Sequence, residues 1–267
     1  MSSILTNNGA IVALQTLKNV NGNLNKAQSE IATGLRVATA KDNSSAWAIA
    51  STMNSDIQSM KTLSNSLTSA GAMVSTARDA AEQISEKLKE IQTKIVQAEN
   101  PDADTAKLQA EVTALTDTIV SIATSAQYNG INLTSAAATD QNVTVSIQRD
   151  DAGALTAEEL TVTAFDLEAL GAALTVGTAT LDDIDTLLDT ANEAAASFGA
   201  AQARIEAQAG FLNKQADSLK MGVSALVDAD MEEASARLQA LQTQQQLGIQ
   251  ALSIANQAPS AVLSLFR

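Results

Sequence analysis

Apolar residues recur at steps of three and four along most of the chain, the pattern of long helices that pack through a narrow seam. Over 53–95 these steps average 3.5 residues, the heptad period of a coiled coil. The same spacing runs over 108–126 and over 181–226, where Gln202 is the one polar residue of the series. The pattern predicts helices at about 47–99, 104–129 and 181–226, which bury their seams against one another as an antiparallel bundle.

Turn and cap signals separate these stretches. Pro101 divides the first two helices, and Asp104 or Thr105 can cap the second. Gly130 suits the carboxyl end of that second helix.

Residues 140–166 follow a different period. Val143, Val145 and Ile147 alternate with polar neighbours, and Leu160 and Val162 do the same. A turn signal, DDAG, lies between them at 150–153. Alternation on both sides of a turn predicts a β-hairpin.

Both ends of the chain carry apolar stripes, although chain termini are normally polar. Ala10, Leu17, Leu24 and Ile31 repeat at intervals of seven, and the C-terminal stretch is rich in uncharged Gln. We expect the two end helices to pair and to bury further faces against partner chains. Pairing within a monomer is the alternative, and it would leave large apolar patches exposed. The expected assembly residues are Ile4, Leu5, Ile11, Leu14, Leu17, Leu24, Ile31, Leu238, Leu241, Leu252, Val262, Leu263, Leu265 and Phe266.

An extended link joins the first terminal helix to the bundle. Gly34 can end the first helix, and the stretch up to Ala46 reads as a spoke between two helical layers. The spoke residues are Gly34, Leu35, Arg36, Lys41 and Asp42.

Composition narrows the function. The 267 residues carry a net charge of −14 and include no Cys and no His, which excludes disulfides, thiolate metal sites and a Ser-His-Asp triad. A negative chain with 2% aromatics is a poor nucleic-acid binder. Acidic clusters at 182–185 and 228–233 fit helix starts better than a metal site. We therefore expect no enzyme, no cofactor, no metal and no membrane insertion.

The N-terminus has neither a basic region nor a continuous apolar run, so no cleaved secretory signal is expected. The negative charge should lie mostly on the bundle, because 2–35 contains only Lys18, Lys26 and Glu30 as charged residues.

Five motifs in order make the chain resemble bacterial flagellin over essentially its whole length. They are IATGLRVATAKDN at 31–43, QYNGINL at 127–133, FGAAQARIE at 198–206, DADMEE at 228–233 and ANQAPSAVL at 255–263. They are similar to the family signatures SGLRINSAKDD, QFNGxxLL, GAxQNRLE, DxDxAxE and ANQAPQxVL. The resemblance implies a mainly α fold with a coiled-coil inner domain (1–34 and 228–267), a spoke (35–46) and an outer rod domain (47–227). The further outer domains of large flagellins should be absent.

The resemblance also implies a function and partners. The chain would self-assemble into the helical filament used for swimming, in many copies, and would be secreted to the extracellular flagellum without a cleaved signal. Its partners would include an export chaperone, the flagellar export apparatus, and hook–filament junction and cap proteins. A patch matching the one that an innate immune receptor recognises on flagellins falls on Lys87, Lys89, Glu90, Ile91 and Glu111.

Three other functions compete with this one. A hook–filament junction protein shares the helical termini, but the ANQAP end favours flagellin. A chemoreceptor-type helical hairpin would continue its heptads through a symmetric tip, whereas this chain has a β-like insert at 131–180. An enzyme is the weakest alternative, for want of a catalytic constellation.

Overall fold

The computed structural model describes residues 7–150, 154–171, 174–176 and 178–264, with the backbone course alone at 155 and over 258–264. The chain forms two compact units, 1–55 with 218–267, and 56–217. Each unit is a set of helices, and the second also carries β-hairpins. The mainly α fold expected from the periodicity is confirmed.

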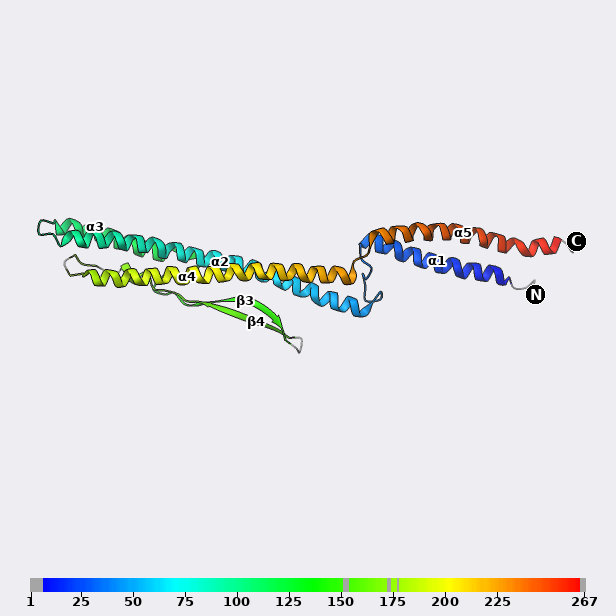
Figure 1. Cartoon of the computed structure of the whole chain (residues 1–267), viewed down its shortest axis with the longest axis horizontal. Coiled ribbons are helices and arrows are strands. Elements are labelled where there is room, and N and C mark those ends of the chain that lie inside the picture. The colour runs from blue at the N-terminus through cyan, green and yellow to red at the C-terminus, as the bar shows by residue number, and fades with distance from the viewer. Residues whose placement is uncertain (1–6, 151–153, 172–173, 177, 265–267) are drawn as a thin grey trace. The chain divides into compact units, whose positions relative to one another are not determined.

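The second unit is built on three helices that lie alongside one another (Figure 1). They are α2 (Ser44–Ala98), α3 (Thr105–Ser125) and α4 (Leu181–Val227), of which α2 and α4 also extend into the first unit. The heptad positions are the buried ones: Leu67, Ile84 and Leu88 of α2 are fully buried, as is Phe198 of α4. The predicted seam is therefore the core of this unit.

Polar pairs join α2 to α4 at intervals of seven residues along α2. Arg78 Nη1 donates to Gln202 Oε1 at 2.8 Å, Ser85 Oγ to Asn192 Oδ1 at 2.8 Å, and Gln92 Nε2 to Asp185 Oδ1 at 2.7 Å. A sliding of one helix past the other would break all these pairs together. They therefore specify the antiparallel register of α2 on α4, as polar residues do in coiled coils.

The motif QYNGINL forms a two-residue ladder, not the end of a helix. β1 (Gln127–Tyr128) pairs with β2 (Ile131–Asn132), and the turn residues Asn129 and Gly130 have φ of 50° and 83°. Positive φ at both central residues is the type I′ hairpin turn. The predicted helix end at 129 was therefore wrong, because α3 stops at Ser125.

The side chains after this turn cap α3. Asn132 Nδ2 and Thr134 Oγ1 both donate to the carbonyl oxygen of Ala123, at 2.8 and 2.9 Å. The last carbonyls of a helix have no partner within the helix, so these bonds stabilise its carboxyl end.

The longer hairpin joins β3 (Gln141–Arg149) to β4 (Leu155–Val162), within the region where alternation predicted it (Figure 1). Val143 lies opposite Leu160, and the register shifts between Thr144 and Ser146. Beyond β4, the Phe165 ring meets Phe198 of α4 edge to face, with centroids 5.5 Å apart. The 3₁₀ turn η1 (Ala169–Gly171) follows, with Leu170 buried.

Acidic residues at helix starts cap the helices, as the sequence predicted. Asp104 caps α3 by accepting from the Lys107 amide. Thr180 and Asp183 cap α4 reciprocally: the Thr180 amide donates to Asp183 at 2.9 Å, and the Asp183 amide donates to Thr180 Oγ1 at 3.2 Å. Among the described residues, no group of three His, Cys, Asp or Glu is placed to hold a metal ion.

The first unit contains α1 (Asn8–Thr33) and α5 (Met231–Ser264), together with the start of α2 and the end of α4. Over the part of the chain that the structure describes, no helix has the length and apolarity needed to cross a membrane.

Gly171 offers a test of how closely η1 packs on α3. A Cβ there would lie 2.5 Å from Val120 Cγ2 and 3.0 Å from the Thr116 carbonyl oxygen, so Gly171→Ala must displace the Val120 side chain or move η1 away from α3. We expect it to lower the free energy of unfolding by about 1–3 kcal/mol, measured by thermal circular dichroism.

The matched control is Gly210→Ala in α4, where a Cβ meets nothing within 4 Å. Alanine there should be neutral or should stabilise by up to about 1 kcal/mol, because glycine is a poor helix former. Equal effects of the two substitutions would contradict the close contact.

Candidate functional site: the paired terminal helices

The terminal helices α1 and α5 run antiparallel and side by side (Figure 1). Leu24 and Ala27 of α1 are buried with Leu241 of α5, and Val20 and Leu238 pack against this cluster. The buried and partly buried positions of α1 follow a heptad, from Ala10 through Leu17, Leu24 and Ile31 with the intervening positions 13, 20 and 27, and Asn21 and Glu30 beside this series are also shielded. The repeat of seven read from the sequence is thus the seam of this pair.

The helices α1 and α5 also approach each other closely toward the end of the pair that is distant from the spoke. Gly248 of α5 lies against Leu17, whose Cδ1 would be 3.2 Å from a Cβ at that position. Gln245 Nε2 donates to Asn21 Oδ1 across the pair at 2.7 Å. The Asn7 side chain, just before α1, donates to the Ala255 carbonyl oxygen at 2.7 Å.

Exposed apolar side chains gather toward the free end of this pair. Ile11 is 53% and Leu14 58% exposed on α1, while Leu247 is 59% and Ile254 70% exposed on α5. Val12 and Ile249 are exposed in the same stretches. Because the helices are antiparallel, both sets lie in the half of the pair that is distant from the spoke. Charge is absent from α5 after Arg237, so the exposed surface of its second half is uncharged.

The structure divides the predicted assembly residues into two groups. Six serve the seam within the subunit, namely Leu17, Leu24, Ile31, Leu238, Leu241 and Leu252. Ile11 and Leu14 remain exposed. Ile4, Leu5, Leu265 and Phe266 lie outside the described residues, as do the side chains of Val262 and Leu263.

Heptad phase would have separated these groups, because Ile11 and Leu14 do not fall on the repeat of Ala10 and Leu17. Val12, Leu247, Ile249 and Ile254 belong to the exposed group and were not in the predicted set. Alone, an apolar residue in a terminal helix does not reveal which face it occupies.

The spoke holds the end of α4. Gly34 ends α1 with φ 70°, and its carbonyl accepts from the Ala229 amide at 2.9 Å. The amides of Arg36 and Val37 donate to the Val227 carbonyl oxygen, at 2.7 and 3.2 Å. The guanidinium of Arg36 donates to the carbonyl oxygen of Leu226 at 3.0 Å. The spoke thus supplies the donors that the last turn of α4 lacks.

A turn follows, which leads into α2. The Thr39 amide and hydroxyl both donate to Asp42 Oδ2, at 3.0 and 2.9 Å. These bonds, the hydroxyl one first, lower the pKa of Asp42 below its ordinary 3.8. Asn43 Oδ1 accepts from the Ala46 amide, as a helix cap does, and Lys41 is exposed.

Charged side chains gather at the spoke end of the terminal pair. Glu30, Arg36, Asp230, Glu233 and Arg237 line a cavity of about 90 Å³, with Ala229 and Ala234. Arg237 is paired with Glu233 at 2.7 Å. The terminal pair therefore has a charged end and an apolar end.

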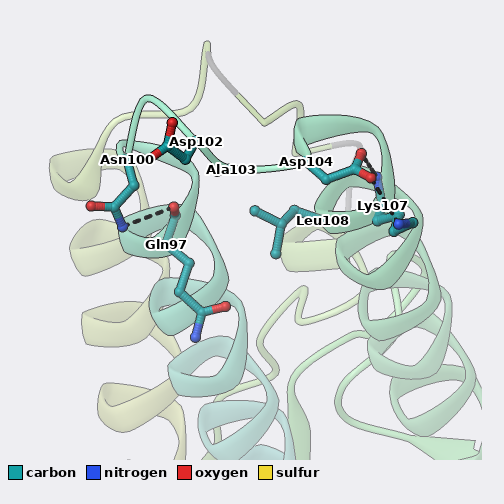
Figure 2. A pocket seen from close by; sticks show the side chains of 7 residues that line it. All are labelled: Gln97, Asn100, Asp102, Ala103, Asp104, Lys107 and Leu108. Carbon is teal, nitrogen blue, oxygen red and sulfur yellow. Dashed lines mark hydrogen bonds and ion pairs between the residues drawn. The ribbon is translucent and has the colours of Figure 1, made fainter.

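A second hollow, of about 360 Å³, lies in the second unit at the turn between α2 and α3 (Figure 2). Its side chains come from 97–108, and the polar ones among them are exposed. They interact with residues close in sequence: Asn100 donates to the Gln97 carbonyl oxygen, and Lys107 forms an ion pair with Asp104. Nothing in this hollow is arranged for catalysis or for holding a cofactor.

The residues matching the receptor patch lie on α2 and α3. Lys87 pairs with Glu90 at 2.7 Å, and Glu111 of α3 pairs with Lys94 of α2 at 2.6 Å. Lys89 is exposed, whereas Ile91 is fully buried. Ile91 therefore supports the packing beneath this surface and does not contribute to it.

Net charge separates the units as the sequence predicted. The unit 56–217 holds 24 of the 30 acidic residues and 9 of the 16 basic ones, a net charge of −15. The unit formed by both ends of the chain is close to neutral, so like-charge repulsion between copies falls on the other unit.

Comparison with known proteins identifies the family. The model of the bacterial flagellin N-terminal helical region matches residues 4–139, and that of the C-terminal helical region matches 181–266. A flagellin of Brucella melitensis is 41% identical, with 100% of both chains covered. The flagellin FljM of Caulobacter vibrioides is 36% identical over 100% of this chain and 99% of that one. Flagellin C of Rhizobium meliloti is 36% identical, again over the whole of both chains.

A solved structure, of Bacillus cereus flagellin, is 23% identical and covers 64% of this chain and 93% of that chain. Its TM-score of 0.33 is too low to bear on the fold.

Paired end helices that leave uncharged apolar surface exposed are typical of a self-assembling structural protein. The chain belongs to the bacterial flagellins, as the two family models and its full-length relatives show.

The seam and the exposed face should respond differently to substitution. Ile254→Gln is expected to leave the helicity of the subunit unchanged and to abolish or strongly weaken self-association. Leu241→Ala should cost about 2 kcal/mol of the pairing of α1 with α5, because it removes buried methyl groups. Circular dichroism measures the helicity and the thermal stability of each variant, and sedimentation measures its self-association. Loss of helicity in Ile254→Gln would contradict the assignment of that side chain to an open face.

The spoke turn should be sensitive to acid. Since the folded pKa of Asp42 is depressed, the stability it contributes is present above pH 3.8 and is lost as pH falls through the folded value. Thr39→Val removes the hydroxyl donor, so the pKa of Asp42 should rise toward 3.8 in a carboxyl NMR titration. The pKa of Asp104, which Lys107 lowers, is the internal control and should not move.

Proposed function

We propose that this chain is the structural subunit of a flagellar filament and that the α1·α5 pair is its polymerisation element. The observation that carries the proposal is the set of exposed apolar side chains on that pair: Ile11, Val12, Leu14, Leu247, Ile249 and Ile254. A single subunit leaves this apolar surface in water, whereas neighbouring subunits can bury it.

The kind of assembly follows from the shape of the contact. This surface lies outside the seam that α1 and α5 use within the subunit, and we propose that a neighbour covers it with a different patch of its own. Heterologous contacts that do not close into a ring generate a helical filament. The full-length relatives are flagellins, which favours the filament over the hook–filament junction.

The charge distribution also supports assembly through the chain ends. With a net −15 on residues 56–217 and a nearly neutral terminal unit, attraction between copies is confined to the chain ends. The acidic unit then stays solvated, in an extracellular filament whose function is mechanical and not enzymatic.

The proposal also covers how the chain is exported. A chain without Cys and with two Pro can be threaded unfolded, because disulfides and slow proline isomers would both delay passage. We propose that an export chaperone and the flagellar export apparatus handle it in this state, and that junction and cap proteins contact the filament ends. The surface around Lys87, Lys89, Glu90 and Glu111 is the proposed region of contact with an innate immune receptor.

Truncation tests the central claim. Deleting 1–30 or 235–267 should leave the second unit folded, with a cooperative thermal transition, and should prevent filament formation seen by negative-stain electron microscopy. The full chain, treated in parallel, is the control. Filaments from either truncated protein would show that the terminal pair is not the polymerisation element.

A further inference from the structure

A proline interrupts the hydrogen bonding of α5. Pro259 lies within the helix Met231–Ser264, and proline has no amide hydrogen. In an α-helix the amide of a residue donates to the carbonyl four positions earlier. The carbonyl oxygen of Ala255 therefore lacks its ordinary helical donor.

Asn7 supplies a donor from the other end of the chain. Its Nδ2 donates to the Ala255 carbonyl oxygen at 2.7 Å, in a partly buried contact. Its Oδ1 accepts from the Ala10 amide at 3.1 Å, as the N-cap of α1. One carboxamide thus starts α1 and bonds to the interrupted turn of α5.

Few side chains can make both bonds. A carboxylate at position 7 could cap α1, but it has no hydrogen to donate. A hydroxyl could cap it, but its donor and acceptor are the same atom and it reaches less far. The backbones also approach closely, since a Cβ on Gly9 would lie 4.0 Å from Ala255 Cβ.

We infer that Asn7, Ala255 and Pro259 form a clip that fixes where α1 begins on α5. Proline leaves the carbonyl open, and asparagine closes the clip. Ile11 lies one turn beyond Asn7, and Ile254 adjoins Ala255, so the clip sets the relative position of the exposed residues at the apolar end of the pair. Its effect on assembly rests on the proposed function, whereas the clip itself does not.

A double-mutant cycle tests the inference in the full chain. Asn7→Asp keeps the capping acceptor and removes the donor. Pro259→Ala returns an amide that can donate to the Ala255 carbonyl, which makes the Asn7 donor dispensable. We expect Asn7→Asp to raise the protein concentration needed for filament formation about tenfold in the native background, and less than about twofold in the Pro259→Ala background.

Asn7→Ser is an uncharged variant for comparison, because serine also caps helices well. It should repeat the effect of Asn7→Asp in both backgrounds, which separates loss of the donor from the added charge. Thermal unfolding of the second unit should be the same in every variant.

Disulfide cross-linking tests the clip independently of filament formation. The chain has no native Cys, and the 4.0 Å between Cβ positions 9 and 255 suits a disulfide. Gly9→Cys with Ala255→Cys should cross-link readily under mild oxidant, and Asn7→Asp should slow this severalfold unless Pro259→Ala is also present. Gly9→Cys with Gly248→Cys, which is out of register, is the control and should cross-link poorly.

The outcomes are distinguishable. Equal effects of Asn7→Asp in both backgrounds, or no effect in the native one, would overturn the clip. Failure of the unmodified chain to form filaments would overturn the proposed function, while the cross-linking rates would still decide the clip.

Discussion

The structure depends on one kind of contact, the packing of small and medium apolar side chains between long antiparallel helices. Such a seam is narrow, and with 2% aromatics the chain has few large groups to thicken it. Stability must therefore accumulate along the length of the helices, and the register of each pair decides whether their apolar positions meet. This explains why polar bonds recur beside the seams: Ser85–Asn192 and Gln92–Asp185 in one unit, and Gln245–Asn21 in the other.

The two units complete their seams to different degrees. In residues 56–217, a third helix and a hairpin cover what two helices leave open, and Leu88, Ile119 and Ile184 are fully buried. The α1·α5 pair has Leu24 and Leu241 at 8% exposure in its half nearer the spoke, and nearer its free end Ile254 is 70% exposed. Two helices cannot enclose a core, so the remaining apolar area is available to other copies of the chain. In the proposed assembly, copies of the chain complete the same kind of packing that folds the subunit.

Local sequence patterns predicted most of the fold but few of the contacts at the terminal site. The heptads predicted the buried face of α2 nearly position by position, since Ile57, Leu67 and Ile91 are all buried, and the alternation predicted the hairpin. The end of α3 was misplaced because Asn129 and Gly130 suit a type I′ turn as well as a helix stop. Contacts such as Asn7 with Ala255 join residues 248 positions apart, and no periodicity in either helix signals them.

Backbone acceptors hold the first unit together at both ends of the terminal pair. At the spoke, the carbonyls of Leu226 and Val227 are open because α4 ends there, and the spoke donates to them. At the free end, Ala255 is open because Pro259 has no amide hydrogen to give. Carbonyl oxygens without a backbone donor of their own occur where a helix ends or is interrupted. The bond from Asn7 therefore replaces the backbone hydrogen bond that Pro259 removes from α5, beside the exposed apolar residues of the proposed polymerisation element.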